Sequence, residues 1–312
     1  MGDVDWASSD RLGTGERSRA NPRRSSIAPA KALLQIDRGG GRRVSPTDVE
    51  PPDTESVLCK IRDGIASIAL NRPHRLNAFT PAMRSLYLET LDRLDGDPDV
   101  RAIVVTGTGR AFCAGADFKE LEGLDAERMR ARHAAQTQPL DRAMHLGKPL
   151  IAAVNGPVAG IGMAHLLMAD LRFASPEARF TTAFSRIGLT AEGGLAWLLG
   201  RLVGTARALD LLYSARVVDA EEALRIGLVQ WLVPADELLV RAHAYAADLA
   251  ATTSAYSLAA MRRQVYDAWD QDWPDALARS RELVYESLDR PEYAELASRR
   301  SGTRRTPPRP RT

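Results

Sequence analysis

Short apolar runs mark the strands that this chain is expected to form. Residues 57–61 and 65–70 alternate between apolar and polar positions. Asp63-Gly64 between them is a typical turn pair, so the two runs predict a β-hairpin. Residues 102–106 and 150–154 are almost continuously apolar, which predicts two buried strands.

The sequence pattern is typical of helices after the hairpin and again toward the end of the chain. Thr80 and Pro81 predict a helix N-cap and first turn, and apolar residues recur at helical spacing from there to Gly96. Asp219 is expected to cap a helix that Gly227 ends, with a strand at 228–233. From residue 236 to about residue 298 the pattern predicts a succession of helices.

The two ends of the chain differ from its middle. Residues 1–55 are polar and rich in glycine and proline, so they are expected to be a disordered extension. Residues 301–312 are basic and proline-rich, and they predict a disordered tail. The remaining chain divides into a core, 56–235, and a helical region, 236–300.

Composition narrows the class of protein. A hydrophobic content of 45% in 312 residues suits a soluble globular protein. No run approaches the length of a membrane span, and the N-terminus lacks the apolar stretch of a signal peptide. The two cysteines, Cys59 and Cys113, are too few for a disulfide framework, and no histidine–cysteine cluster has metal-ligand spacing. We therefore expect a cytoplasmic protein with no metal.

A glycine-rich turn lies between the strand at 150–154 and an apolar helical run at 163–168. Gly156, Gly160 and Gly162 allow the backbone to turn tightly there. A strand, a turn and a helix start in this order aim free backbone N–H groups at one point, where they could hold an oxygen that acquires negative charge. The same arrangement also occurs without any chemistry, so the turn alone leaves both interpretations open.

Two segments resemble the signatures of a known family. Residues 148–174, KPLIAAVNGPVAGIGMAHLLMADLRFA, and residues 109–121, GRAFCAGADFKEL, look like the second and first signatures of the crotonase superfamily, the enoyl-CoA hydratase/isomerase family. The resemblance covers about residues 57–285. It implies an α/β crotonase fold, with a repeated ββα superhelical core and a C-terminal helical region used for oligomerisation.

The resemblance also implies a catalytic arrangement. The N–H groups of Ala116 and Ile161 match the pair that forms the family's oxyanion hole. Hydratases of the family carry two glutamates, whose positions are occupied here by Ala164 and Phe184. Glu192 matches the place where Δ3,Δ2-enoyl-CoA isomerases carry a single catalytic acid, although an acid at a helix start is also favoured by the helix dipole alone.

CoA is implied as part of the substrate, and no separate cofactor is expected. Arg262 and Arg263 could reach a CoA phosphate or be solvated surface charges. His165 is one residue along the helix from Ala164, about 100° away, so we expect it to be packed or exposed rather than catalytic. The positions that match the family's contacts with the CoA thioester are Arg75, Ala78, Ala114, Ala116, Asp117, Phe118, Lys119, Gly160 and Ile161.

The predicted function is therefore that of an acyl-CoA enzyme that forms a thioester enolate and shifts an enoyl-CoA double bond. A hydratase, or another crotonase-type lyase or hydrolase, remains an alternative. A non-catalytic CoA-binding or RNA-binding homologue is an alternative of another class. Nucleic acid is disfavoured, because no aromatic residues interleave with Arg128, Arg130 and Arg132. Apolar stretches in the C-terminal helices predict a homotrimer or homohexamer.

Overall fold

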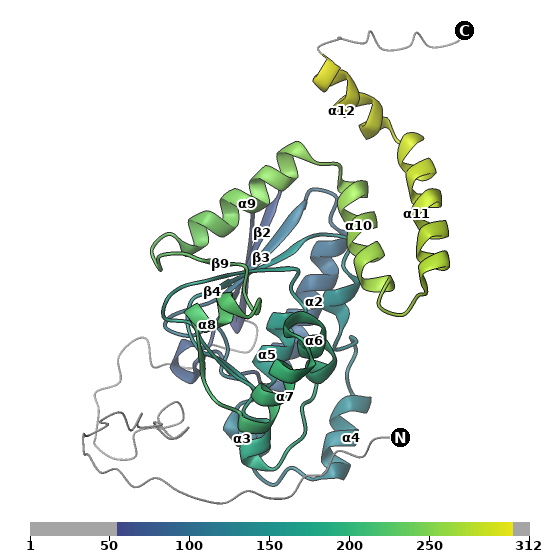
Figure 1. The fold of residues 1–312 in the computed structure, drawn as a ribbon. Coiled ribbons are helices and arrows are strands. Elements are labelled where there is room, and N and C mark those ends of the chain that lie inside the picture. Colours follow the sequence, from purple (N-terminus) through teal and green to yellow (C-terminus); the bar gives the residue numbers. More distant parts are fainter. Residues whose placement is uncertain (1–54, 302–312) are drawn as a thin grey trace, which may run out of the picture. The chain divides into compact units, whose positions relative to one another are not determined.

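In the computed structural model, residues 55–301 are described (Figure 1). The predicted disordered segments, 1–55 and 301–312, lie outside this range except for residues 55 and 301. Both assignments therefore stay predictions. All structural statements below concern residues 55–301.

The centre of the described chain is a six-stranded sheet in the order β1-β2-β3-β4-β6-β9. The first two strands form the predicted antiparallel hairpin, and Asp63 and Gly64 in its turn both have positive φ. The other neighbours pair in parallel. The strands are β1 (Val57–Arg62), β2 (Ile65–Leu70), β3 (Ala102–Gly107), β4 (Leu150–Val154), β6 (Leu171–Ala174) and β9 (Trp231–Leu232).

A second, three-stranded sheet has the order β5-β7-β8. Its strands are β5 (Val158–Ala159), β7 (Arg179–Thr181) and β8 (Val218–Asp219). Three residues, 155–157, separate β5 from β4, and Gly160 alone separates β5 from the next helix, so the chain passes from one sheet to the other at the glycine-rich turn. This step places the turn next to the ends of both sheets.

Helices cover both faces of the large sheet (Figure 1). On β3, Ile103 and Val105 pack into the main core with α2 and α5, whereas Ala102 and Val104 face α9. The strand is thus buried on both faces, as its continuous apolar run predicts. The helices are α2 (Pro81–Gly96), α3 (Phe118–Leu121), α4 (Ala126–Ala134), α5 (Ile161–Leu167), α6 (Leu195–Val203), α7 (Thr205–Ser214), α8 (Ala220–Arg225), α9 (Leu238–Thr252), α10 (Ala255–Asp267), α11 (Trp273–Leu288) and α12 (Pro291–Ser301), with short 3-10 turns η3 (Pro73–Arg75), η4 (Arg142–His145) and η5 (Phe184–Ile187).

Three boundaries differ from the sequence predictions. Helix α5 begins at Ile161 rather than at 163, because Gly160 takes a positive φ of 52° and the chain turns helical immediately after it. The strand predicted at 228–233 is reduced to β9, Trp231–Leu232, which pairs only with Phe173 and Ala174. Helix α9 begins at Leu238, two residues after the predicted start.

Candidate active site

The two signature loops touch each other at the edge of the sheets. Cys113 forms an isolated parallel bridge with Val158, and its carbonyl accepts a 3.0 Å hydrogen bond from the N–H of Ala159. Gly115 has a φ of +102°, and a Cβ there would lie 2.9 Å from the carbonyl oxygen of Ala159. Only glycine combines that backbone conformation with that contact. The sequence therefore brings the residues that follow, Ala116 and Gly160, onto adjacent loops.

Both backbone N–H groups that match the family's oxyanion hole lack a protein acceptor within residues 55–301. The first belongs to Ala116, whose neighbours Gly115 and Asp117 make the hydrogen bonds to Phe79. The second belongs to Ile161, the first residue of α5. Free N–H groups fixed on rigid elements can stabilise an oxygen that becomes negative during a reaction.

The loop at the start of α6 packs against the same turn of α5. Gly193 has a φ of +62°, and a Cβ there would lie 2.8 Å from Cδ1 of Ile161 and 3.0 Å from Cβ of Ala164. Glu192, directly before it, is half-buried, and its carboxylate makes no hydrogen bond or ion pair with another residue in the described range. The structure thus brings the backbone of residues 192–193 beside Ile161 and Ala164. Phe184 is buried in η5.

Two polar side chains that sequence reasoning did not assign to the site, Arg84 and His165, lie close enough for the charge of Glu192 to act on Arg84 and for that of Arg84 to act on His165. Arg84 is half-buried on α2. Partial burial lowers the pKa of Arg84, the Glu192 carboxylate opposes this shift, and Arg132 adds to it. Burial, with a smaller contribution from the charge of Arg84, lowers the pKa of His165 to about 3, so His165 is neutral at pH 7. The sequence does hold a signal for Arg84, because it is the one charged residue at helical spacing with Tyr87, Leu88 and Leu91 on the mainly apolar inward face of the helix.

The residues predicted to contact the CoA thioester have different environments. Asp117 is buried, and its carboxylate forms a 2.9 Å ion pair with Arg72 and caps α3 by accepting from the N–H of Lys119. That carboxylate is therefore committed to holding the loop. Burial raises the pKa of Asp117, but the hydrogen bonds from Arg72 and from the N–H of Lys119, together with the charges of Arg72 and Arg75, lower it overall. Phe118 and Lys119 are exposed. The others are buried or half-buried, namely Arg75, Ala78, Ala114 and Gly160.

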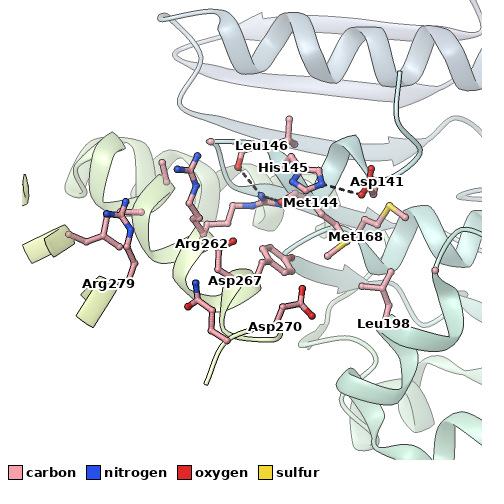
Figure 2. A pocket seen from close by; sticks show the side chains of 18 of the residues that line it. Asp141, Met144, His145, Leu146, Met168, Leu198, Arg262, Asp267, Asp270 and Arg279 are labelled. Atoms are coloured by element: carbon pink, nitrogen blue, oxygen red, sulfur yellow. Dashed lines mark hydrogen bonds and ion pairs between the residues drawn. The ribbon is translucent and has the colours of Figure 1, made fainter. Parts of the chain in front are cut away.

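A cavity of about 1100 Å³ lies elsewhere, between η4, α6, α10 and α11 (Figure 2). It reaches Gly193 and Gly194 but not Glu192, Ala116 or Ile161. The groups predicted to carry the chemistry are therefore outside it.

Arg262 at this cavity corrects one sequence interpretation. Its side chain is only 7% exposed, so it is not a solvated surface charge. It pairs with Asp170 at 2.9 Å and donates to the carbonyl oxygens of Ala143 and Met144. It also donates to the carbonyl oxygen of Leu146 (Figure 2). Because each of its three side-chain nitrogens donates to the core, Arg262 joins α10 to it. Arg263, next to it, is exposed.

Residues 55–301 offer neither a metal site nor a membrane span. No group of three or more His, Cys, Asp or Glu side chains in this range is arranged to hold a metal ion. None of the helices in this part of the chain has the length and apolar character needed to cross a bilayer.

Comparison with known proteins gives one consistent answer. The sequence profile of the enoyl-CoA hydratase/isomerase family matches residues 60–296, well over half of the chain. A probable enoyl-CoA hydratase from Rhodobacter capsulatus is 38% identical over 226 residues, which is 72% of this chain and 86% of that protein. The 1,2-epoxyphenylacetyl-CoA isomerase of Escherichia coli is 34% identical over 225 residues, 69% of this chain and 83% of the relative.

Solved structures agree on the fold. The crystal structure of a probable enoyl-CoA hydratase/isomerase from Mycobacterium abscessus superposes with a TM-score of 0.74 at 34% identity, covering 79% of this chain and 96% of that chain. The likeness confirms the α/β crotonase fold with its C-terminal helical region. The two signature loops, the match over residues 60–296 and this shared fold together show that the chain belongs to the enoyl-CoA hydratase/isomerase family.

Proposed function

We propose that this acyl-CoA enzyme moves the double bond of an enoyl-CoA with Glu192 as its single proton carrier. The observation that supports this most is the pair of positions at which hydratases of the family carry glutamates. Ala164 and Phe184 occupy them, and neither side chain can bind or activate water. Glu192 has a half-buried carboxylate without a protein partner in the described range, beside the turn that carries Ile161.

The reaction then follows from three groups. The N–H groups of Ala116 and Ile161 bind the thioester oxygen, and they bind it more strongly as it gains charge. Glu192 removes a proton from the carbon next to the thioester carbonyl, which leaves an enolate conjugated with the double bond. The resulting Glu192 carboxyl returns the proton two carbons along, so the double bond moves one position toward the thioester. Atoms and charge balance without water or a redox partner.

Hydration is the second candidate, because the Rhodobacter relative and several solved neighbours are named as enoyl-CoA hydratases. The Escherichia relative is named as an isomerase of an acyl-CoA, which supports the first candidate. The two reactions differ by one water in the product.

A panel of 3-enoyl-CoA and 2-enoyl-CoA thioesters, followed by chromatography and mass spectrometry, separates the two candidates. Isomerisation predicts that a 3-enoyl-CoA is converted to a product of unchanged mass and altered retention. The addition of one water to a 2-enoyl-CoA at a comparable rate would instead make the protein a hydratase.

We also propose that the protein assembles as a homotrimer or homohexamer through its C-terminal helices. Large apolar side chains on α11 are exposed, among them Trp273 at 76% and Tyr285 at 59%. A surface of this kind on a monomer is typical of an interface. Light scattering at micromolar concentration tests this, and a monomer mass would contradict it.

A further inference from the structure

The backbone carbonyl oxygen of Ala111 joins the segments that build the predicted oxyanion hole. Ala111 is buried on the loop that leads from β3 toward Ala116. Its carbonyl oxygen accepts a 2.8 Å hydrogen bond from Nδ2 of Asn77 and a 3.2 Å hydrogen bond from Nδ2 of Asn155. Asn77 follows η3 and Asn155 follows β4, so the two donors come from distant parts of the chain. One peptide oxygen thus connects three segments.

Both asparagine side chains make further hydrogen bonds to the same loop, 107–111. Asn155 accepts from the N–H of Gly107 at 3.2 Å and donates to the carbonyl oxygen of Gly109 at 2.9 Å. Asn77, which is 0% exposed, donates to the carbonyl oxygen of Thr108 at 2.9 Å. An amide suits this task because it carries an acceptor and two donors, whereas a carboxylate can only accept. The two side chains therefore clamp the loop from both sides.

Close backbone packing holds the clamped loop in place. A Cβ at Gly107 would lie 2.1 Å from the carbonyl oxygen of Ala111, and a Cβ at Gly156 would lie 2.2 Å from that of Arg110. Gly156 directly follows Asn155, so the turn after β4 lies against the loop as well. Packing this dense passes a displacement on to neighbouring groups instead of absorbing it.

The clamped loop continues directly into the segments that carry both N–H donors. From Ala111 the chain runs to Cys113, which bridges to β5, and then to Ala116. A Cβ at Gly162 would lie 2.7 Å from the carbonyl oxygen of Cys113. The first turn of α5, which begins at Ile161, therefore rests on the same segment. A shift of the clamped loop would change the separation of the two donors.

We propose that Asn155 and Asn77 are positioning residues, which set the separation of the two predicted oxyanion donors by clamping the carbonyl group of Ala111. This inference rests on the proposed function for the role of the N–H groups of Ala116 and Ile161. Both asparagines act through the loop and not on the substrate. Donors stabilise a developing oxyanion only at the correct distance, and a misplacement of about 1 Å can lower the rate on the order of 100-fold.

Asn155→Asp tests the clamp, because aspartate keeps the acceptor for the N–H of Gly107 and loses both donated hydrogen bonds. The readout is the infrared carbonyl stretching frequency of isotope-labelled butanoyl-CoA, a saturated thioester, bound to the protein. Well-placed donors polarise the carbonyl group and lower this frequency in the wild-type protein. We expect Asn155→Asp to lose about half of that shift or more. Turnover of the preferred enoyl-CoA should fall about 10-fold to 100-fold, while the Kd of butanoyl-CoA changes less than about threefold.

Asn71→Asp is the matched control, because Asn71 donates to the carbonyl oxygen of Glu55 and would keep its acceptor for the hydroxyl of Thr108. It should retain the shift and the turnover. Asn155→Ala, which removes the amide without adding a charge, gives the same readouts if the aspartate variant does not fold. A variant of Asn155 that binds butanoyl-CoA with the wild-type carbonyl shift overturns the proposal. Absence of a shift in the wild-type protein would instead overturn the oxyanion hole of the proposed function, and the clamp with it.

Discussion

The polar groups at the two ends of the segment 161–170 differ in whether they have partners within the protein. At its C-terminal end, Asp170 accepts hydrogen bonds from the N–H of Leu150, from Arg262 and from the hydroxyl of Tyr266. Arg262 in turn donates to three carbonyl oxygens on the segment that contains η4. Each charge there is matched, and the network ties α5, β4 and α10 together.

At the N-terminal end, two buried groups lack a hydrogen-bond partner in the described range. They are the backbone N–H of Ile161 and the ring of His165. A fold does not gain stability from such groups, because a buried polar atom that lacks a hydrogen bond costs free energy. The comparison indicates that the matched end is scaffold, whereas the unmatched end holds polar groups that the fold itself does not satisfy.

Breaking the matched end should have the largest effect. We expect Arg262→Met to lower the free energy of unfolding by about 3 kcal/mol, because it removes the ion-pair partner of Asp170 and leaves three carbonyl groups without their donor. Asp170 keeps two other donors and is 18% exposed, which holds the loss to the lower end of the usual range. Urea unfolding measures this. Arg263→Met is the control and should change little, whereas equal effects of the two substitutions would contradict a structural role specific to Arg262.

Acid should act on the unmatched end through His165. Its folded-state pKa is about 3 and its ordinary value is 6.5, so between these pH values only the unfolded chain binds the proton. Stability that is present above pH 6.5 is therefore lost as the pH falls toward 3. Between pH 7 and pH 5 this loss amounts to about 2 kcal/mol.

The variant His165→Phe should lose correspondingly less stability over the same pH interval. His145→Gln is the control, because the His145 side chain is 65% exposed. Unfolding titrations at the two pH values give the comparison. An identical pH dependence in the wild-type protein and in His165→Phe would show that the ring is not held neutral by the fold.

Two glycine substitutions separate the effect of the contact between the Glu192 loop and α5 from the effect of backbone strain. Gly193 and Gly188 both have positive φ, so alanine at either position should cost about 1–2 kcal/mol of stability. Only at Gly193 would the new Cβ press on Ile161 and Ala164, since nothing lies within 4 Å at Gly188.

We therefore expect Gly193→Ala to lower turnover as well, because it displaces Glu192, and Gly188→Ala to leave turnover nearly intact. Steady-state kinetics on the preferred enoyl-CoA, at matched folded fractions, provides the test. Equal turnover in the two variants would mean that the loop position does not matter for catalysis.

Local patterns predicted much of the fold. Thr80 accepts from the N–H of Met83 as an N-cap, and α2 ends at Gly96, both as the capping and periodicity signals indicate. The hairpin, β3 and β4 could be predicted equally well, because the signal for each lies in residues close together in the sequence. The short strand β9 was overestimated, because its length is set by what Phe173 and Ala174 can pair with rather than by its own apolar run.

The site was less accessible to sequence reasoning. The positions of Ala116, Ile161 and Glu192 follow from family resemblance, and their roles stay predictions. Arg262 was assigned to the surface because its partner Asp170 lies 92 residues away in the sequence. Tyr87 and His165 meet only through the packing of α2 on α5, so no local pattern could pair them.

The most direct test of the account is the turnover of a 3-enoyl-CoA by Glu192→Gln. The substitution keeps the shape of the side chain and removes the base, while leaving the N–H groups of Ala116 and Ile161 in place. We predict a loss of turnover of about 100-fold or more, with thioester binding almost unchanged. Turnover close to that of the wild-type protein would contradict the account and reduce Glu192 to a charge at the start of a helix.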